Sequence, residues 1–443
     1  MPIKINNERD LIASLRSVDA PTLGIELIVF LSAALLLVLK GATNTLSFIL
    51  SFSCIWLLIS RAHGGAKWRI VGNVWPVIAC LCAPLSTTIL SQLGQLSFKV
   101  SDFDGPSRLL LFIPVYLYML RLDRDRLINA LAFGSLVGVT LVFCSLVMFP
   151  EQYWGYRAAT YFIDPITLPV YTVALMGIFI FADPVRKNPT IKYVLNTSLL
   201  LMTSFVILES QSRTSWLAFV GLIVVWIFYK RPSNWIQICM MPLLLITVGI
   251  VSYKLSDVIQ VRISDVISVL SIFAEGSSEE FHTVVQNSAI GHRIVSFFID
   301  LRLLHDNFWF GTLDKDMPPY DELALKIPLL NEEIYNIKRL SGSHSEFLSQ
   351  MVQKGAIFGG LSLVFYFIYP SYIILKGIRR EIDANTSKSA GFLGFIVTLF
   401  LSSLTIQVFN LKVTATFFGL CLVIFLSSVY TMPKKQSADL FDQ

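Results

Sequence analysis

A histidine late in the chain stands before a short amphipathic stretch. His344 is followed by Phe347, Leu348, Met351 and Val352, a spacing that predicts a short helix with one apolar face in the membrane interface. The imidazole then lies at the polar edge of that helix. Because its ordinary pKa is close to neutrality, it can take a proton from a hydroxyl group as that hydroxyl attacks. The alternative is a histidine at a helix start that bonds to backbone or to a lipid phosphate.

Arg213 closes a very short turn between two apolar runs, Ser210-Gln-Ser-Arg213. The next helix begins there, so its free N–H groups and its dipole favour an anion, with Ser210 or Ser212 as a cap. A guanidinium beside them can make bidentate bonds to phosphate oxygens. The turn therefore offers a phosphate site, and the alternative is an interfacial arginine that reaches lipid headgroups.

Two further arginines lie among aromatic residues. Arg293 starts an amphipathic run with Phe297 and Phe298 one turn on, and it is either a second anion ligand or a solvated charge on a loop helix. Arg157 follows Tyr-Trp-Gly-Tyr, whose rings suit either stacking on sugar rings or the aromatic belt of a membrane interface. We treat Arg157 as a possible substrate contact.

An acidic pair, Asp102-Phe-Asp104, lies in a predicted loop. Two carboxylates at this spacing can hold a divalent ion that carries a donor phosphate. A bare pair of this kind is more often a solvated loop, and we favour that interpretation. We expect neither a metal nor another cofactor.

The scaffold that positions these residues is membrane-embedded. The chain is 54% hydrophobic and 15% charged with a mean hydropathy of +0.66, which excludes an ordinary soluble domain. The net charge of +5 comes from dispersed basic residues, so we expect no nucleic-acid partner. The apolar runs are of membrane-spanning length. They predict about twelve transmembrane helices, near 23–39, 45–61, 71–91, 108–121, 128–149, 165–183, 193–209, 214–229, 235–252, 356–376, 389–409 and 413–430.

Lysine and arginine gather in alternate connections between these spans. The opposite set, outside the long segment before the tenth span, holds only Lys40, Lys99, Arg108, Arg157, Arg213 and Lys412. This positive-inside bias predicts cytoplasmic termini and places residues 253–355 outside the cytoplasm. We therefore divide the chain into a membrane domain with spans one to nine (1–252), a periplasmic loop (253–355), and spans ten to twelve with a cytoplasmic tail (356–443).

The long loop has residue patterns that are typical of helices. Apolar spacing predicts helices over 256–273 and about 284–305, whereas 312–342 shows no clear period. We expect two or three helices that lie along the outer membrane face. The predicted fold is thus an all-α polytopic membrane protein with one large helical periplasmic loop.

Three parts of the chain, in order, resemble motifs of the O-antigen ligase and O-antigen polymerase superfamily of bacterial envelope glycosyltransferases. Ser210-Gln-Ser-Arg213-Thr-Ser-Trp216-Leu resembles its Ser-Arg-Thr-x-Trp turn at the start of a span. Gly291-His-Arg293, followed by Asp306-Asn-Phe-Trp-Phe-Gly311, resembles its arginine-containing helix and Asp-Asn-Pro-x-x-Gly turn. His344-Ser345, nine residues and then Gly355 resemble its His-[Asn/Ser/Gln]-x9-Gly element. The resemblance covers about 210–360, with departures at Phe308, where proline is usual, and at Phe358.

The resemblance implies a GT-C-like membrane enzyme that performs an inverting, metal-independent transfer of an undecaprenyl-diphosphate-linked glycan. Carried over residue by residue, Arg213 and Arg293 hold the diphosphate, and His344 is the base on the acceptor hydroxyl. The physical logic is consistent with this. No nucleotide sugar is at hand outside the cytoplasm, so the donor must arrive on a lipid. Its diphosphate leaves readily once two arginines and a helix terminus neutralise its charge.

The sequence does not identify the acceptor. A ligase would use a lipid A core sugar, a polymerase another lipid-linked repeat, and a protein-directed relative a serine or threonine; the single large loop favours the ligase. A polysaccharide flippase or other transporter is the alternative from another class. It would need ionisable residues buried at mid-span, and the predicted spans are almost free of them. A metal-dependent membrane glycosyltransferase that uses Asp102 and Asp104 is a further alternative.

Overall fold

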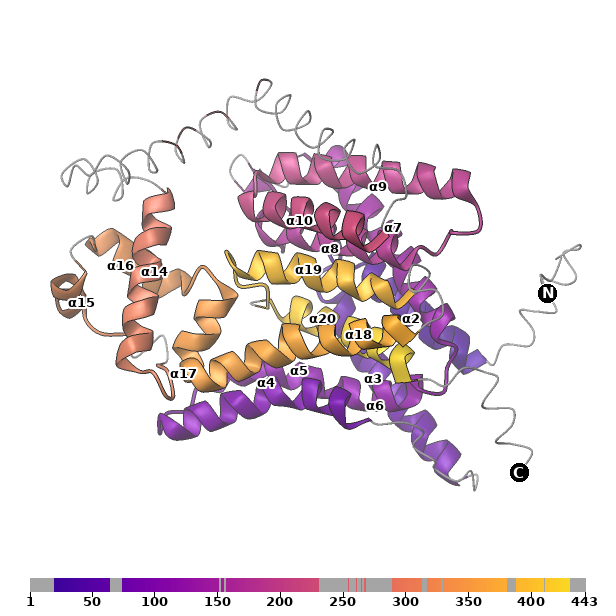
Figure 1. The fold of residues 1–443 in the computed structure, drawn as a ribbon, viewed down its shortest axis with the longest axis horizontal. Helices are drawn as coiled ribbons and strands as arrows, with labels where there is room; N and C mark the ends of the chain where they lie inside the picture. Colours follow the sequence, from indigo (N-terminus) through magenta and orange to yellow (C-terminus); the bar gives the residue numbers. More distant parts are fainter. Residues whose placement is uncertain are drawn as a thin grey trace, which may run out of the picture.

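The computed structural model shows a bundle of helices with a smaller group of helices at one end (Figure 1). It describes residues 20–63, 74–150, 153–154, 157–230, 254, 260, 264, 267, 289–312, 317–327, 330–380, 388–409 and 411–430. The predicted ninth span, 235–252, lies outside the described residues. So does the predicted helix 256–273, except for residues 260, 264 and 267, which are helical.

The elements of the first half of the chain are helices apart from one pair of two-residue strands, in the order α2 (Ala20–Ala34), α3 (Ala42–His63), α4 (Trp75–Gly94), α5 (Ser101–Leu110), α6 (Phe112–Met119), α7 (Arg124–Met148), β1 (Tyr153–Trp154), β2 (Arg157–Ala158), α8 (Thr167–Ala182), α9 (Pro189–Ser210) and α10 (Arg213–Lys230). The later elements are α14 (Ala289–Asp306), α15 (Tyr320–Lys326), α16 (Glu332–Ser341), α17 (Glu346–Leu363), the π-helical turn η2 (Val364–Ile368), α18 (Tyr369–Arg380), the 3-10 turn η4 (Lys388–Ala390), α19 (Gly391–Ser403) and α20 (Lys412–Tyr430).

Six helices of the described chain are long and apolar enough to cross a membrane, and four shorter helices are apolar as well. Together they account for every predicted span that the structure describes except the fourth. That segment, 108–121, is divided between α5 and α6 at Leu111. Pro114 has no N–H for the carbonyl four residues earlier, which explains the break. The fold is that of an all-α membrane protein, as the composition predicts.

Two helices form the centre of the bundle. Every residue of α8 is buried, and α20 is buried along most of its length. Helices α7, α9, α10 and α19 pack around α8, while α3, α5, α6 and α18 pack against α20. Because lipid tails are as apolar as these side chains, close packing rather than hydrophobic burial holds such helices together. The central helices are thus rigid supports for the segments at their ends.

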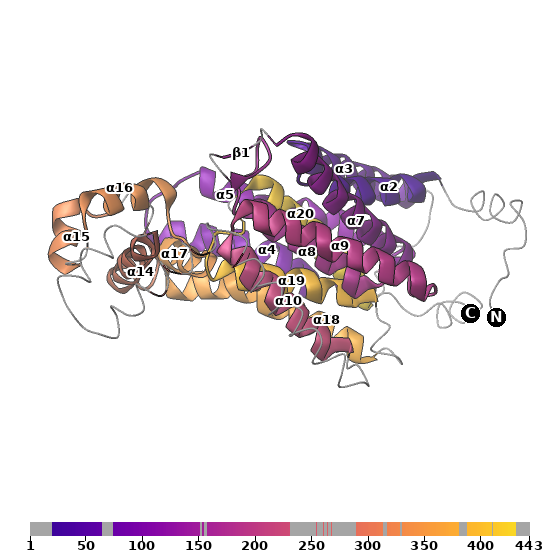
Figure 2. The same ribbon diagram turned by 90° about the horizontal axis from the view of Figure 1, so that it is seen from above.

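Helices α14, α15 and α16 enclose a second, smaller core. Val295, Ile299, Leu323 and Ile334 are buried together there, and Val352 of α17 joins them. In Figures 1 and 2 these three helices occupy one end of the bundle, and α14 runs across the direction of α4, α17 and α19. We call this the α14 end. The prediction of a helix over 284–305 is confirmed by α14.

The helices α15 and α16 arise where the sequence shows no clear period. Each is short, so apolar spacing has little length over which to repeat. A cap starts α16, because the side chain of Asn331 accepts a hydrogen bond of 2.7 Å from the Ile334 N–H. Pro319 precedes α15 in an extended conformation. Local caps rather than periodicity therefore define this part of the structure.

Contacts between connections sort the bundle into two ends. At the end opposite α14, the Arg124 guanidinium donates to the Ser428 carbonyl at 3.0 Å, and Lys388 lies 3.5 Å from Asp125. At the α14 end, Lys412 pairs with Asp104 at 2.5 Å. Each of these contacts joins connections that the charge bias assigns to the same side.

Candidate functional site

The segment around His344 is fastened to the loop that follows α19. Ser345 caps α17 by accepting from the Leu348 N–H at 3.5 Å, and its hydroxyl donates to the Ser403 carbonyl at 3.0 Å. The Gln407 amide donates to the Ser343 carbonyl at 2.7 Å. Bonds on both sides of His344 thus fix the backbone that carries the imidazole.

A buried polar cluster supports the same segment from α14 and α16. The Lys338 ammonium and the Ser343 hydroxyl both donate to the Asp300 carboxylate, at 2.5 and 2.8 Å. All three side chains are buried. A buried charge is tolerated only when it is paired and hydrogen-bonded, so this cluster strongly constrains the residue just before His344.

His344 is half-buried and lies close to several cationic groups. Burial, together with the charges of Arg293, Lys338 and His292, lowers the pKa of its imidazole to about 4. The imidazole is therefore neutral at pH 7 and can accept a proton. An anion bound beside Arg293 would offset these positive charges and raise the pKa, which makes His344 a stronger base. The structure brings Arg293 of α14 near His344 of the segment before α17.

The turn at Arg213 lies where the sequence predicts it, but without the predicted serine cap. Helix α9 ends at Ser210 and α10 begins at Arg213, with Gln211 in the left-handed conformation. Arg157 joins this turn, because its Nε donates to the Ser210 carbonyl at 2.9 Å. The predicted possible substrate contact therefore lies beside the predicted phosphate site.

Neither serine of this turn caps α10. The Ser210 hydroxyl bonds back to the Ile207 carbonyl at 3.0 Å. The Ser212 hydroxyl is buried and has no hydrogen-bond partner among the described residues, and the same holds for Ser402 in α19. Buried hydroxyls without partners are rare in proteins. The Ser212 hydroxyl directly precedes α10, so it is one polar group at this N-terminus that a ligand could use.

The loop 404–409 connects the two parts of the site. The Thr214 hydroxyl in the first turn of α10 lies 2.7 Å from the Thr405 hydroxyl. From the other side, the Glu346 N–H donates to the Ile406 carbonyl at 3.0 Å. The Arg213 turn and the His344 segment thus border one short loop, although more than a hundred residues separate them in the chain.

Two glycines of the motifs contact each other. Gly311 and Gly355 both have positive φ, at 75° and 79°. A Cβ on Gly355 would overlap the Trp309 carbonyl, and one on Gly311 would overlap the Gly355 nitrogen. The Thr312 N–H donates to the Val352 carbonyl at 2.8 Å. Only glycine fits at these positions, so their role is to lock the turn after α14 onto α17.

The departures Phe308 and Phe358 belong to the same junction. The Phe308 carbonyl accepts from the Ala356 N–H at 2.8 Å, and Phe358 stacks on Phe310 with ring centroids 5.9 Å apart. Aromatic packing at this junction holds the turn against α17. Both departures therefore have a structural explanation.

Gly355 also divides α17 into two pieces. Its φ of 79° and ψ of 163° interrupt the helix, so a short helix of residues 346–354 precedes the membrane-length part. The predicted short helix is therefore present. Its half-buried Phe347 stacks on Phe367 with ring centroids 5.9 Å apart and meets Phe400 at 5.4 Å, so part of its apolar face packs against other helices.

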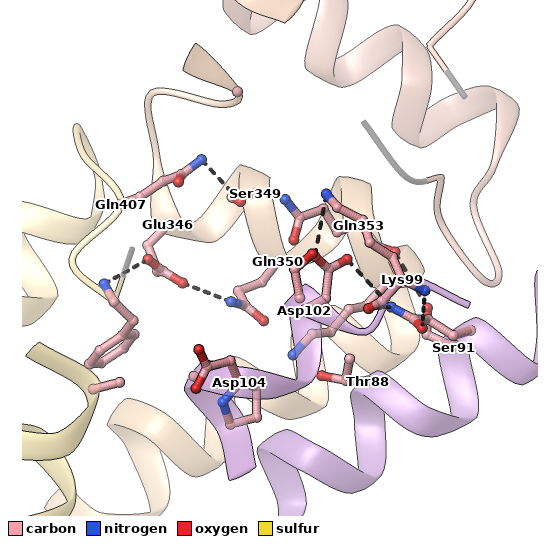
Figure 3. Close-up of a pocket in the computed structure, with 18 of the residues that line it drawn as sticks. Thr88, Ser91, Lys99, Asp102, Asp104, Glu346, Ser349, Gln350, Gln353 and Gln407 are labelled. Atoms are coloured by element: carbon pink, nitrogen blue, oxygen red, sulfur yellow. Dashed lines mark hydrogen bonds and ion pairs between the residues drawn. The ribbon is translucent and has the colours of Figure 1, made fainter. Parts of the chain in front are cut away.

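A polar cavity of about 400 Å³ lies against the short helix, between α4, α5, α17 and α20 (Figure 3). Its polar lining comes from amide, hydroxyl and charged side chains, among them Gln92, Lys99, Asp102, Asp104, Glu346, Ser349, Gln350, Gln353, Lys354, Gln407 and Lys412. None of the predicted site residues Arg157, Arg213, Arg293 and His344 lines it. The cavity lies next to the histidine segment, because Gly342 and Glu346 are both part of its wall.

The acidic pair, predicted to lie in a solvated loop, lies instead in the first turn of α5 and forms part of this wall, where both carboxylates pair with cations. Asp102 lies 3.3 Å from the Lys99 ammonium, and Asp104 accepts from Arg108 at 2.8 Å as well as from Lys412. Lys412 first, and then Arg108, hold the pKa of Asp104 below its ordinary value. Among the described residues, no group of three or more His, Cys, Asp and Glu side chains is arranged to hold a metal.

A buried network forms the floor of the cavity, and sequence reasoning missed it. Glu346 accepts from the Gln350 amide at 2.7 Å and from the Phe409 N–H at 3.2 Å. The Ser362 hydroxyl bonds to Gln350 at 3.3 Å and accepts from the Lys354 ammonium at 3.2 Å. Helical spacing of these polar residues along α17 is a signal, but a solvated helix face produces the same pattern.

Comparison with models of known protein families finds no match for the chain, and comparison with curated proteins finds none. What the structure defines is the class: an all-α membrane protein with a polar, cation-rich site at one end of its bundle. The assignment of a reaction rests on the chemistry of that site.

Proposed function

We propose that the chain is a membrane glycosyltransferase of the O-antigen ligase and polymerase type. It transfers a glycan from undecaprenyl diphosphate to a sugar hydroxyl by inversion and without a metal, and lipid A core is the favoured acceptor. The observation that carries the proposal is the convergence of three distant segments. Arg293 lies near His344, and the Arg213 turn borders the same loop as the His344 segment.

The arrangement suits a displacement at the sugar carbon that bears the diphosphate. Arg213, the N-terminus of α10 and Arg293 would neutralise the diphosphate, which then leaves without a general acid. His344, neutral at pH 7, would take the proton from the attacking hydroxyl. The new bond joins the acceptor oxygen to the sugar, and the bond to the diphosphate oxygen breaks.

The proposed topology has twelve spans, cytoplasmic termini, and the site on the periplasmic side of a bacterial inner membrane. Two observations support it. Lysine and arginine gather in alternate connections, and the contacts between connections join those that this bias assigns to the same side. In this arrangement α14, α15 and α16 are part of the proposed periplasmic loop, and membrane lipids surround the bundle.

The metal-dependent alternative has less support, because Asp102 and Asp104 already pair with Lys99, Arg108 and Lys412. A transporter is favoured by the buried Glu346 and Lys354, which are ionisable. They lie in the short helix before Gly355, however, and not in the middle of the span that follows.

Purified protein in lipid vesicles tests the reaction. We expect it to transfer glycan from membrane-extracted polyprenyl-diphosphate donor to membrane-extracted acceptor, with full activity after treatment with EDTA. Loss of transfer on chelation that Mg²⁺ restores would instead support the metal-dependent alternative. Movement of donor across the vesicle membrane without transfer would support the transporter.

The envelope polysaccharides of a deletion strain identify the acceptor. Full-length chains that stay lipid-linked and are absent from lipid A core indicate a ligase. Core that bears a single repeat indicates a polymerase.

A further inference from the structure

We infer that the cavity beside the short helix 346–354 binds one or two uncharged sugar units of a glycan substrate. The inference rests on the proposed function and deepens it, because it assigns a glycan subsite to residues outside the histidine and arginine cluster. The glycan belongs either to the acceptor or to the donor. Both sources present the same hydroxyl-rich surface to the cavity.

The lining has the hydrogen-bonding character of a sugar site. Amides and hydroxyls dominate it, from Gln92, Gln350, Gln353, Gln407, Thr88, Ser91, Ser101 and Ser349. An amide both donates and accepts, as a sugar hydroxyl does. The Gln353 side chain lines the cavity and has no hydrogen-bond partner among the described residues (Figure 3). The cavity volume of about 400 Å³ lies within the range of about 300–1,000 Å³ for small-molecule sites.

The charges of Lys99, Lys412, Glu346 and Lys354 in the cavity wall are already compensated inside the protein, and the remaining lining cation, Arg339 of α16, is exposed to solvent. Lys99 faces Asp102 at 3.3 Å, and Lys412 faces Asp104 at 2.5 Å. Glu346 has both of its carboxylate oxygens hydrogen-bonded, and the same buried network reaches Lys354. A phosphate would find no uncompensated cation at this floor, whereas an uncharged ligand can use the amides without separating an ion pair.

An aromatic pair supplies the apolar part of the wall. Tyr366 and Phe409 both line the cavity and stack on each other, with centroids 4.5 Å apart and an interplanar angle of 23°. Tyr366 lies in the π-helical turn η2, close before Pro370, which lacks the N–H that a regular helix needs. Binding sites for small molecules commonly combine such apolar surface with a few placed polar groups.

The cavity is next to the proposed base. Gly342 and Glu346, two residues before and two after His344, belong to its wall. The Gln407 side chain contacts both the histidine segment, at the Ser343 carbonyl, and the cavity residue Ser349, at 2.7 and 3.2 Å. A glycan held in the cavity would therefore lie beside the start of the short helix, close to His344 in the chain.

Gly105 allows the cavity to be filled without disturbing the backbone. It lines the cavity from α5, and a Cβ there would meet nothing within 4 Å. Gly360 in α17 has the same free space and does not line the cavity, so it is the matched control. We expect Gly105→Phe to raise the KM for one substrate at least about tenfold, equivalent to about 1.4 kcal/mol, and Gly360→Phe to change neither KM.

The substrate whose KM changes identifies the source of the glycan. A higher KM for the acceptor alone places the acceptor in the cavity, and a higher KM for the donor alone places the donor's glycan there. Gln353→Ala, which removes an amide without filling space, should raise the same KM. Unchanged constants for both substrates in folded Gly105→Phe protein would overturn the inference. Equal loss in the Gly360→Phe control would do so too.

A photoreactive phenylalanine at position 105 gives a measurement that does not depend on transfer. After irradiation of intact membranes, mass spectrometry should find glycan attached to the protein, and a Gln353→Ala background should reduce the amount. Attachment of lipid chains alone would overturn the inference. If His344→Ala retained transfer, the proposed reaction would fail while the crosslink still reported whether glycan occupies the cavity.

Discussion

The segment from Gly342 to Gly355 has two different neighbours. On one side Arg293, Lys338 and His292 act on His344 with positive charge, and the hydroxyl of Ser212 at the N-terminus of α10 has no hydrogen-bond partner among the described residues. On the other side Lys99 and Lys412 are paired with carboxylates, and amide side chains line the cavity. A lipid-linked glycan has the same division, because its diphosphate is charged and its sugars are not.

This difference teaches that one short helix can separate two kinds of recognition. Charge-assisted bonds on the cationic side are strong and matter most when charge develops on the leaving group. Neutral hydrogen bonds contribute less each, and under the proposed function those on the cavity side would decide which glycan binds. Changes on the two sides should therefore alter different kinetic constants.

The largest effect is expected for His344→Ala. Loss of a general base lowers kcat by about 10²–10⁴-fold, with little change in the KM of the donor. Transfer by purified protein in vesicles measures both constants. His305→Ala is the matched control, since this histidine is exposed on α14 and pairs with Asp306 at 3.2 Å. Equal activity of the two variants would remove His344 from the mechanism.

The second effect concerns the support of the histidine segment. Lys338→Met leaves the buried Asp300 carboxylate without its ammonium, which should destabilise the α14–α16 region by about 3–5 kcal/mol. Limited proteolysis should then cut within 317–345 at a lower temperature, and kcat should fall with it. Lys326→Met, which removes an exposed pair with Glu322, serves as the control. A proteolytic pattern like that of the control would show that the buried pair does not hold the segment.

These expectations indicate which features a sequence can predict. A bilayer requires long apolar runs with charge at their ends, so the long apolar helices were predictable. The turn at Arg213 was predictable because only Gln211 and Ser212 separate the two helices. Local spacing also predicts the short helix after His344, since a helix places residues three and four apart on one face.

The cavity was not predictable, because its walls come from α4, α5, α17 and α20. No local pattern places Gln92 near Gln407, and the acidic pair at Asp102 and Asp104 resembles a solvated loop in any short window. The packing partners of the short helix were not predictable for the same reason. Phe347 packs against Phe367 and Phe400, and no local pattern indicates these contacts.

A third prediction uses pH to separate the two sides. The acid limb of kcat/KM, which reports the free enzyme, should lie near the depressed pKa of His344, about 4, because transfer needs the neutral imidazole. Activity is then constant as pH falls from 7 and is lost near that value. Arg293→Gln removes one cation, so the pKa should rise and the limb should move to higher pH. It should not return to 6.5, since burial is the larger cause.

Arg302→Gln is the control for this measurement. Arg302 is a partly exposed arginine on the same helix, paired with Asp306 at 3.0 Å. The acid limb should stay in place in this variant. An unmoved limb in Arg293→Gln would mean that Arg293 does not act on the base.

The smallest effect is expected for Asp104→Asn, on the cavity side. The Asp104–Lys412 pair is partly exposed, so its loss should change stability by less than about 1 kcal/mol. Lys412 in the cavity wall would then lack its carboxylate partner, and the KM of one glycan substrate should rise about threefold or less, whereas kcat stays unchanged. Asp104→Asn combined with Lys412→Met removes both charges and should restore part of the affinity. If Asp104→Asn instead abolished turnover and the double variant did not recover it, the carboxylate would belong to the chemistry, and the division between a charged and a neutral side of the short helix would be wrong.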